Sequence, residues 1–209
     1  MSTRDGILAK LQKKAHPFPL PEKWAQFRQF PNMVQKFTTI LEEAKGEVIY
    51  THSAKEAAEQ VKKQLERFNA QAVVINDENP LNDLKLTEHF PGYRWHIVDT
   101  TDGDLRQFCA TADVGITGAE AALAETGSLV MSSGRGKSRF TSLLPPVHIA
   151  VVPVSCMKSD IFAWEQSMSK TLPGWVGIIS GPSKTGDIEG ILILGVHGPK
   201  KLIVVLYED

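Results

Sequence analysis

Short runs rich in Val, Ile and Leu recur along the chain, and most are separated from the next by a segment long enough to form a helix. The runs read EVIYT (47–51), AVVIN (72–76), RWHIVD (94–99), DVGIT (113–117), GSLVM (127–131), VHIAVVPV (147–154), WVGIIS (175–180) and KKLIVVLY (200–207). Strands that are apolar along their whole length are typical of a parallel sheet that is buried on both faces. The sequence therefore predicts an α/β fold with a mostly parallel sheet and helices on both faces.

The segments between these runs carry helix signals. Pro31 can open a helix, because a proline fits the first helical position, and apolar residues recur at helical spacing after it. Ser53 and Glu56 have the spacing of a capping box, which predicts that a helix begins there. Further helices are predicted near 103–112 and over 157–170.

The N-terminal part differs from the rest of the chain. Its first fifteen residues predict a short amphipathic helix with Ile7, Leu8 and Leu11 on one face, and the segment HPFPLPEKW that follows is too rich in proline for a helix. We therefore expect an N-terminal helix and a Pro-rich linker over residues 1–30, and one α/β domain over residues 31–209.

The composition is that of an ordinary globular protein. The 209 residues include 23 basic and 24 acidic side chains, and a charged fraction of 22% favours neither disorder nor a charge-dominated binder of nucleic acid or membrane surfaces. No run approaches the roughly 20 apolar residues that cross a bilayer, and the first residues lack the pattern of a signal peptide. We expect a cytoplasmic protein with no nucleic-acid partner and no membrane span.

The cysteines and histidines bear on metal chemistry. Cys109 and Cys156 are the only two cysteines, and their apolar surroundings are typical of reduced thiols in a cytosolic protein. An iron–sulfur cluster normally takes four cysteine thiolates, so any such cluster is expected in a partner protein. The six histidines have no zinc-ligand spacing, and we expect no metal site.

Ligands of open α/β sheets bind beyond the carboxyl ends of strands, so residues that follow predicted strands are site candidates. The first group lies within 115–128 and comprises Thr117, Gly118, Glu125, Thr126, Gly127 and Ser128. Its glycines allow a sharp turn or a close approach to a ligand, and Glu125 supplies a carboxylate. Alternatively, Glu125 caps backbone amides and Gly127 is only a turn residue.

The second group follows the run WVGIIS. It comprises Ser180, Gly181, Pro182, Ser183, Thr185 and Asp187. Asp187 and Glu189 are predicted in the first turn of a following helix, where they complement the helix dipole and could orient a basic residue or a substrate hydroxyl. A well-capped helix without a ligand is the alternative interpretation.

The third group is the basic loop 133–139. It lacks the glycine spacing of a P-loop or a dinucleotide-binding turn, but Arg139 could hold a carboxylate with two hydrogen bonds. The alternative is a solvated surface loop. His148 and His197 lie next to predicted strands, where each could act as an acid or base or could be an ordinary structural histidine.

Four of these segments together resemble the LUD-domain family. They are ADVGITGAEAALAETGS, SLLPPVHIAVV, ISGPSKTGDIE and LGVHGPKKLIVVL, in the family's order and with similar spacing. The resemblance runs from about Lys36 to the C-terminus. It implies a fold similar to that of ribose-5-phosphate isomerase, glucosamine-6-phosphate deaminase and the CoA transferases, and a role in oxidising L-lactate to pyruvate alongside iron–sulfur proteins.

Carried over residue by residue, the resemblance points to the residues singled out above. Glu125 and His197 are the candidate catalytic residues, and the other members of the first two groups, with Arg139, are candidate ligand-binding residues. The favoured hypothesis is a subunit that binds a small carboxylate and acts with iron–sulfur lactate-utilization proteins. The alternatives are a stand-alone enzyme on a sugar phosphate, a folate or a CoA ester, with Glu125 as base or nucleophile, and a non-catalytic scaffold.

Overall fold

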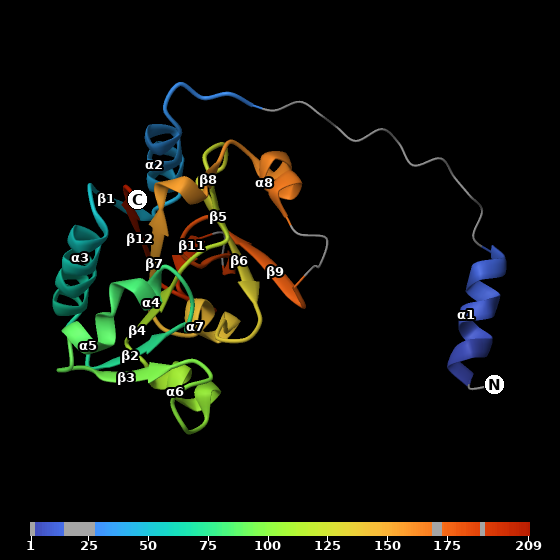
Figure 1. The fold of residues 1–209 in the computed structure, drawn as a ribbon, viewed down its shortest axis with the longest axis horizontal. Helices are drawn as coiled ribbons and strands as arrows, with labels where there is room; N and C mark the ends of the chain where they lie inside the picture. Colours follow the sequence, from blue (N-terminus) through green and yellow to red (C-terminus); the bar gives the residue numbers. More distant parts are fainter. Residues whose placement is uncertain (1–2, 15–27, 169–172, 189–190) are drawn as a thin grey trace.

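A six-stranded parallel sheet forms the centre of the protein (Figure 1). The computed structural model describes residues 3–14, 28–168, 173–188 and 191–209. In spatial order the strands are β1 (Glu47–Thr51), β12 (Lys201–Tyr207), β7 (Val147–Pro153), β4 (Val114–Thr117), β2 (Ala72–Ile75) and β3 (Arg94–Ile97). Every neighbouring pair is parallel. The predicted α/β class is therefore confirmed.

Three helices cover one face of this sheet. They are α3 (Ala54–Arg67), α4 (Leu81–Leu84) and α5 (Leu86–His89). The predicted cap of α3 is present, because the Ser53 side chain accepts a hydrogen bond from the backbone N–H of Glu56. Val61 and Leu65 of α3 pack against strand residues such as Ile149 and Ile203 in one buried cluster. Burial of these apolar side chains is the main stabilising contribution of this layer.

The other face is covered partly by helices and partly by a second sheet. The helices are α2 (Met33–Glu43), α6 (Leu105–Thr111) and α7 (Arg139–Leu143). The second sheet has the order β8 (Met157–Lys158), β5 (Ala121–Leu123), β6 (Ser128–Ser133) and β9 (Trp175–Ile179). The runs GSLVM and WVGIIS thus form strands, as predicted, but they pair antiparallel with each other outside the parallel sheet. The short 3₁₀ helix η1 (Val154–Cys156) connects β7 to β8.

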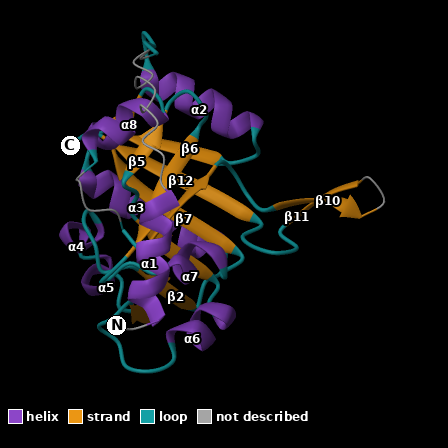
Figure 2. Cartoon of the chain, turned by 90° about the vertical axis from the view of Figure 1, so that its right-hand side faces the viewer, coloured by secondary structure: helices purple, strands orange, loops and turns teal. Residues whose placement is uncertain are grey.

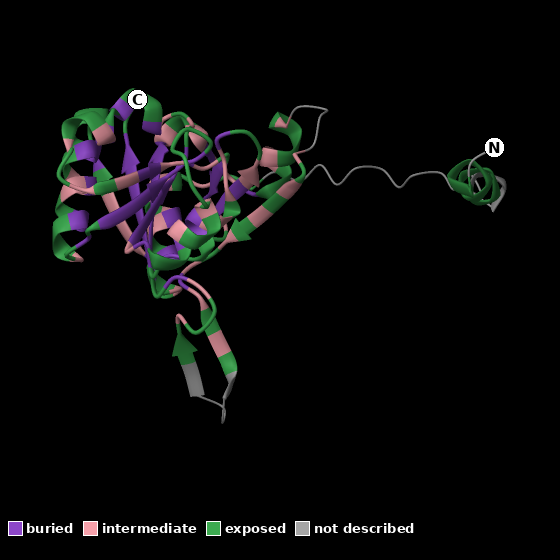
Figure 3. Ribbon diagram, turned by 90° about the horizontal axis from the view of Figure 1, so that it is seen from below, coloured by how far each residue is buried: buried purple, intermediate pink, exposed green. Residues whose placement is uncertain are grey.

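Two local predictions are wrong. The helix expected over 157–170 is only α8 (Ile161–Ser167), because Met157 and Lys158 pair with β5 and Asp160 caps the helix later. The helix expected after Ser183 is instead an antiparallel hairpin of β10 (Lys184–Ile188) and β11 (Ile191–Leu194). This hairpin projects from the body, and its described side chains are mostly exposed (Figures 2 and 3). Glu189 lies outside the described residues.

The N-terminal helix α1 (Thr3–Lys14) lies apart from the body (Figure 1). Its apolar residues Ile7, Leu8 and Leu11 are exposed. The predicted linker lies largely outside the described residues, and the division into 1–30 and 31–209 stays a prediction. In the described part of the chain, no helix is both long and apolar enough to span a membrane. Cys109 and Cys156 are free thiols.

Candidate functional site

Several of the motif residues surround one small cavity. Its volume is about 260 Å³, and its lining includes Ser180, Ser183, His148, His197 and Gly198. We call it the serine–histidine cavity. His148 lies near the start of β7 and Gly198 shortly precedes β12, so the cavity is at the amino ends of these two parallel strands. From the sequence we expected a site beyond the carboxyl ends of strands; Ser180 does follow the carboxyl end of β9, but this strand belongs to the second sheet.

Backbone hydrogen bonds hold the turns around the cavity. The Ser183 N–H donates to the carbonyl of Pro199 at 2.9 Å, and the Gly195 N–H donates to the carbonyl of Ser183 at 2.8 Å. The hydroxyl oxygens of Ser128 and Ser180 are 2.7 Å apart. The turn that contains Glu125 therefore contacts the turn that begins at Ser180, through the hydroxyl groups of Ser128 and Ser180.

His148 is the most unusual residue of the cavity. Its side chain is almost completely buried, and burial lowers its pKa to about 3, so the ring is neutral at physiological pH. Nε2 lies 2.8 Å from Oγ1 of Thr117, which is also fully buried. Within the described residues Nδ1 has no hydrogen-bond partner. A buried polar atom without a partner costs free energy, so the unpaired Nδ1 calls for an explanation such as a bound ligand or water.

The Thr117 contact favours one of the two tautomers of the His148 ring. In the described part of the chain, Nε2 of His148 is the only hydrogen-bond partner of the Thr117 hydroxyl. If Nε2 donated to Thr117, both the hydroxyl hydrogen and the Nδ1 lone pair would be buried without a partner, whereas the opposite direction leaves only the Nδ1 hydrogen unpaired. We therefore infer that Nε2 accepts from Thr117 and that Nδ1 of the neutral ring carries the hydrogen. The cavity contains a histidine whose unpaired nitrogen is a hydrogen-bond donor.

Glu125 does not line this cavity. Its carboxylate forms an ion pair with Nε of Arg28 at 2.8 Å, and its backbone N–H donates to the carbonyl of Ser159. The neighbouring Thr126 is exposed. The structure thus places Ser128 of this turn against Ser180, which lines the cavity, but directs Glu125 toward the segment that precedes α2. Sequence spacing could not reveal this, because adjacent residues of a turn face different ways.

The two glycines of these turns have a structural role. Gly127 has a φ of +59°, and a Cβ there would lie 2.6 Å from the backbone nitrogen of Leu41. Gly181 has a φ of +133°, and a Cβ there would lie 2.9 Å from the carbonyl oxygen of Ala44. Both glycines let a turn approach the backbone at the C-terminal end of α2. From the sequence we considered a close approach of Gly127 to a ligand, but the neighbour that Gly127 approaches is helix α2.

The remaining predicted residues are scattered. Arg139 is exposed, its guanidinium lies 5.9 Å from the centre of the Phe140 ring, and it lines a different cavity from the one beside Ser180. Its place at the start of α7, capped by Ser138, explains this position. Thr185 pairs with Ile193 in the projecting hairpin. Pro182 is buried, and the side chain of Asp187 lies outside the described part of the structure.

An ionic cluster that the sequence analysis missed lies at the carboxyl ends of β2 and β4. The Gly118 N–H and the Asn76 side-chain amide both donate to Oε1 of Glu78, at 3.0 and 2.8 Å. Nζ of Lys137, from the basic loop, lies 2.7 Å from Oε1 of Glu120 and 3.5 Å from Oε2 of Glu78. Glu78 follows the run AVVIN, so the rule of inspecting residues after strands would have found it. Lys137 of the basic loop 133–139 is thereby paired and is not a freely solvated side chain.

Sequence comparison identifies the family. The sequence profile of the LUD domain matches residues 34–207. The chain belongs to the LUD domain family. This LUD domain is 34% identical over 152 residues to lactate utilization protein C of Halalkalibacterium halodurans, a match that covers 69% of this chain and 66% of the relative. It is 31% identical over 220 residues to an uncharacterized protein of Neisseria meningitidis, with 98% of this chain and 93% of that protein covered.

A solved structure supports the fold of this LUD domain. The crystal structure of a DUF162 family protein from Deinococcus radiodurans superposes with a TM-score of 0.59 over 84% of this chain and 96% of that chain. The sequence identity is 19%, so this likeness bears on the fold alone. The expected likeness to the ribose-5-phosphate isomerase group stays a prediction.

Proposed function

We propose that this LUD domain is a component of a lactate-utilization system that oxidises L-lactate to pyruvate, and that it binds a small carboxylate in the serine–histidine cavity. Membership of the family and relatives named lactate utilization protein C support the pathway. The single observation that carries the site is the buried Nδ1 of His148, which has no partner among the described residues and belongs to a cavity-lining ring.

The donors around the cavity favour a ligand with acceptor oxygens. Nδ1–H of His148 can donate, and the hydroxyls of Ser180 and Ser183 and the ring of His197 add further polar groups. A volume of about 260 Å³ is at or below the lower end of ordinary ligand pockets, which favours a ligand of few atoms. A carboxylate offers two acceptor oxygens and no donor when ionised, which matches this set of donors.

We further propose that the electron carriers of this system belong to iron–sulfur partner proteins and that the system is cytoplasmic. A cluster normally takes four cysteine thiolates, whereas this chain has two cysteines. Both are free, and burial raises the pKa of Cys109 to about 11, which keeps its thiol protonated and unreactive. Free thiols are typical of a reducing compartment.

Calorimetric titration tests the ligand. Lactate and pyruvate are expected to bind the full chain, whereas lactamide, which has nearly the same shape but no charge, is expected not to bind. His148→Gln removes the Nδ1 donor and should weaken binding at least about tenfold, which corresponds to one lost hydrogen bond to a charged group. His89→Gln, at the surface of α5, is the matched control and should bind like the native protein.

The same titration separates the alternatives. Saturable binding of ribose 5-phosphate, a folate or a CoA ester without binding of either acid would contradict the proposal and favour a stand-alone enzyme. Retained pyruvate affinity in His148→Gln would show that the acid binds elsewhere. Purification of the native protein from lactate-grown cells tests the proposed partners. Co-purifying proteins with iron–sulfur absorbance would support a complex with iron–sulfur partners, whereas purification of this chain alone would argue against a stable complex.

A further inference from the structure

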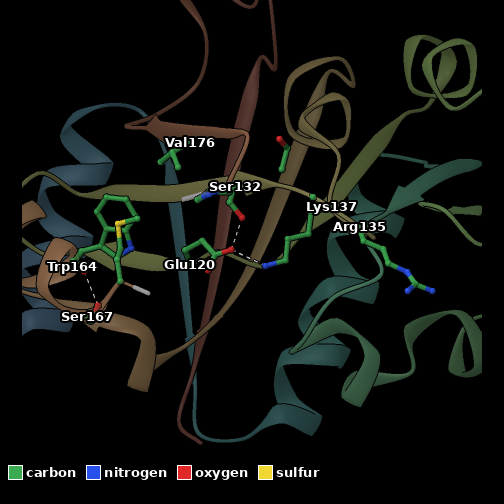
Figure 4. Close-up of a pocket in the computed structure, with 11 residues that line it drawn as sticks. Glu120, Ser132, Arg135, Lys137, Trp164, Ser167 and Val176 are labelled. Atoms are coloured by element: carbon green, nitrogen blue, oxygen red, sulfur yellow. Dashed lines mark hydrogen bonds and ion pairs between the residues drawn. The ribbon is translucent and has the colours of Figure 1, made fainter. Parts of the chain in front are cut away.

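A second cavity lies between α8 and the outer face of the second sheet (Figure 4). Its volume is about 480 Å³, within the range of small-molecule sites. Glu120, Ser132 and Lys137 provide its polar lining, and Trp164, Met168 and Val176 its apolar lining. We call it the Trp164 cleft.

Three charged side chains line the cleft, the carboxylate of Glu120 and the cations Lys137 and Arg135. Lys137 is already paired, because its Nζ contacts the carboxylates of both Glu120 and Glu78. Arg135 also borders the cleft, but its guanidinium extends away from Glu120 and Trp164 (Figure 4). Beside Glu120, the carboxylate would repel a ligand anion and attract a ligand cation.

One carboxylate oxygen of Glu120 is unused. Lys137 and the Ser132 hydroxyl, at 2.7 and 2.5 Å, both donate to Oε1. Oε2 has no hydrogen-bond partner among the described residues. Burial alone would raise the pKa of Glu120, but the hydrogen bonds from Lys137 and Ser132 and the Lys137 charge hold it below its ordinary value. The carboxylate is therefore charged at neutral pH, with one oxygen free to accept.

An aromatic wall faces this carboxylate. Trp164 rests on Ala121, Leu123 and Val130 of the second sheet. In Figure 4 its ring lies on the side of Glu120 away from Lys137, and Val176 lies near the same side. A tryptophan face attracts cations through its ring electrons, and more strongly than the other aromatic side chains do. The carboxylate and the aromatic wall thus favour the same sign of ligand charge.

We infer that the Trp164 cleft binds a small organic cation, an ammonium group on an apolar or aromatic body. The ammonium donates to Oε2 of Glu120, and the body lies against Trp164 and Val176. This site differs from the serine–histidine cavity in position and in the charge of its ligand, so it does not depend on the proposed function.

Titration calorimetry on the full chain with benzylammonium, and with phenylacetate as an anion of similar shape, tests the inference. Benzylammonium should bind saturably and phenylacetate should not. Glu120→Gln should weaken benzylammonium binding at least about tenfold, because the ion pair is lost. Glu43→Gln, an exposed position on α2, is the matched control and should leave binding unchanged.

Further variants keep the test decisive. Trp164→Leu retains an apolar side chain but removes the aromatic face, so it should also weaken benzylammonium binding. This variant keeps the inference testable if Glu120→Gln does not fold. His148→Gln should leave benzylammonium binding unchanged, which separates this site from the carboxylate site. Absence of saturable benzylammonium binding, equal binding of phenylacetate, or native affinity in folded Glu120→Gln would each overturn the inference.

Discussion

The hydroxyl oxygen of Thr117 lies 2.8 Å from Nε2 of His148, and neither side chain reaches solvent. This contact joins β4 to β7 at the centre of the parallel sheet. From this contact we infer a neutral histidine ring with its hydrogen on Nδ1, the nitrogen that has no partner within the described residues. The chemistry of the serine–histidine cavity follows from this pair.

The depressed pKa of His148 predicts how stability depends on pH. Its pKa is about 3 in the folded state and near 6.5 when unfolded, so between these values the unfolded chain binds the extra proton. The free energy of unfolding therefore falls as the pH decreases through this window, by about 1 kcal/mol from this group between about pH 7 and pH 5.5.

Chemical denaturation at the two pH values measures this loss. His148→Gln should show a shallower decrease than the native protein. The slope should not vanish, because burial also lowers the pKa of His96. An identical slope in the native protein and in His148→Gln would mean that His148 does not resist protonation in the folded protein.

Removing the Thr117 hydroxyl should destabilise the fold. Thr117→Val keeps the shape of the side chain but leaves Nε2 of His148 buried without a partner, which is expected to cost about 1–3 kcal/mol. In Thr117→Val combined with His148→Phe the orphaned nitrogen is gone, so the double variant should lose less than the sum of the single losses. If denaturant unfolding showed that the stability losses of the two single variants simply add up in the double variant, this would argue against a direct interaction between Thr117 and His148.

Gly127 should tolerate no side chain. Gly127→Ala places a Cβ against the backbone of Leu41 at a positive φ, so we expect a loss of about 2 kcal/mol or more in the free energy of unfolding. At this chain length the loss corresponds to about 4 °C or more in Tm. Gly92→Ala is the control, because a Cβ there would have no atom within 4 Å. Equal melting temperatures for the two variants would contradict the close contact with α2.

Glu125 should not contribute to carboxylate binding in the cavity. Its carboxylate pairs with Arg28, whose side chain is 66% exposed, so the pair contributes at most about 1 kcal/mol to stability. Glu125→Gln is therefore expected to retain native affinity for pyruvate in calorimetric titration and to change stability only slightly. A loss of pyruvate affinity in Glu125→Gln comparable to that in His148→Gln would show that Glu125 contributes to the binding site.

Most of the central sheet could be predicted because its strands are apolar on both faces. Runs such as VHIAVVPV and KKLIVVLY leave no polar face for an amphipathic helix, and both form buried parallel strands. The sequence did not predict which of the two sheets each strand would join. Residues 128–133 and 175–179 have the same apolar character but pair in the second sheet, because strand propensity does not specify a partner.

The candidate site was predictable in part. Ser180, Ser183, His197 and Ser128 were singled out from their place beside strands and in the family motifs, and the structure brings them together. The directions of Glu125 and Arg139 were not predictable, since each depends on which side of a turn faces the cavity. The helix expected at Asp187 failed because Thr185 and Ile193 pair across a hairpin.

The central claim is that Nδ1–H of His148 donates to a carboxylate in the serine–histidine cavity. Heteronuclear NMR of protein labelled with a nitrogen isotope in its histidine rings tests it most directly. We predict a neutral His148 ring with the hydrogen on Nδ1, and a shift of that resonance when lactate or pyruvate is added but not when lactamide is added. A ring with its hydrogen on Nε2, or an Nδ1 resonance that neither acid moves, would contradict the account.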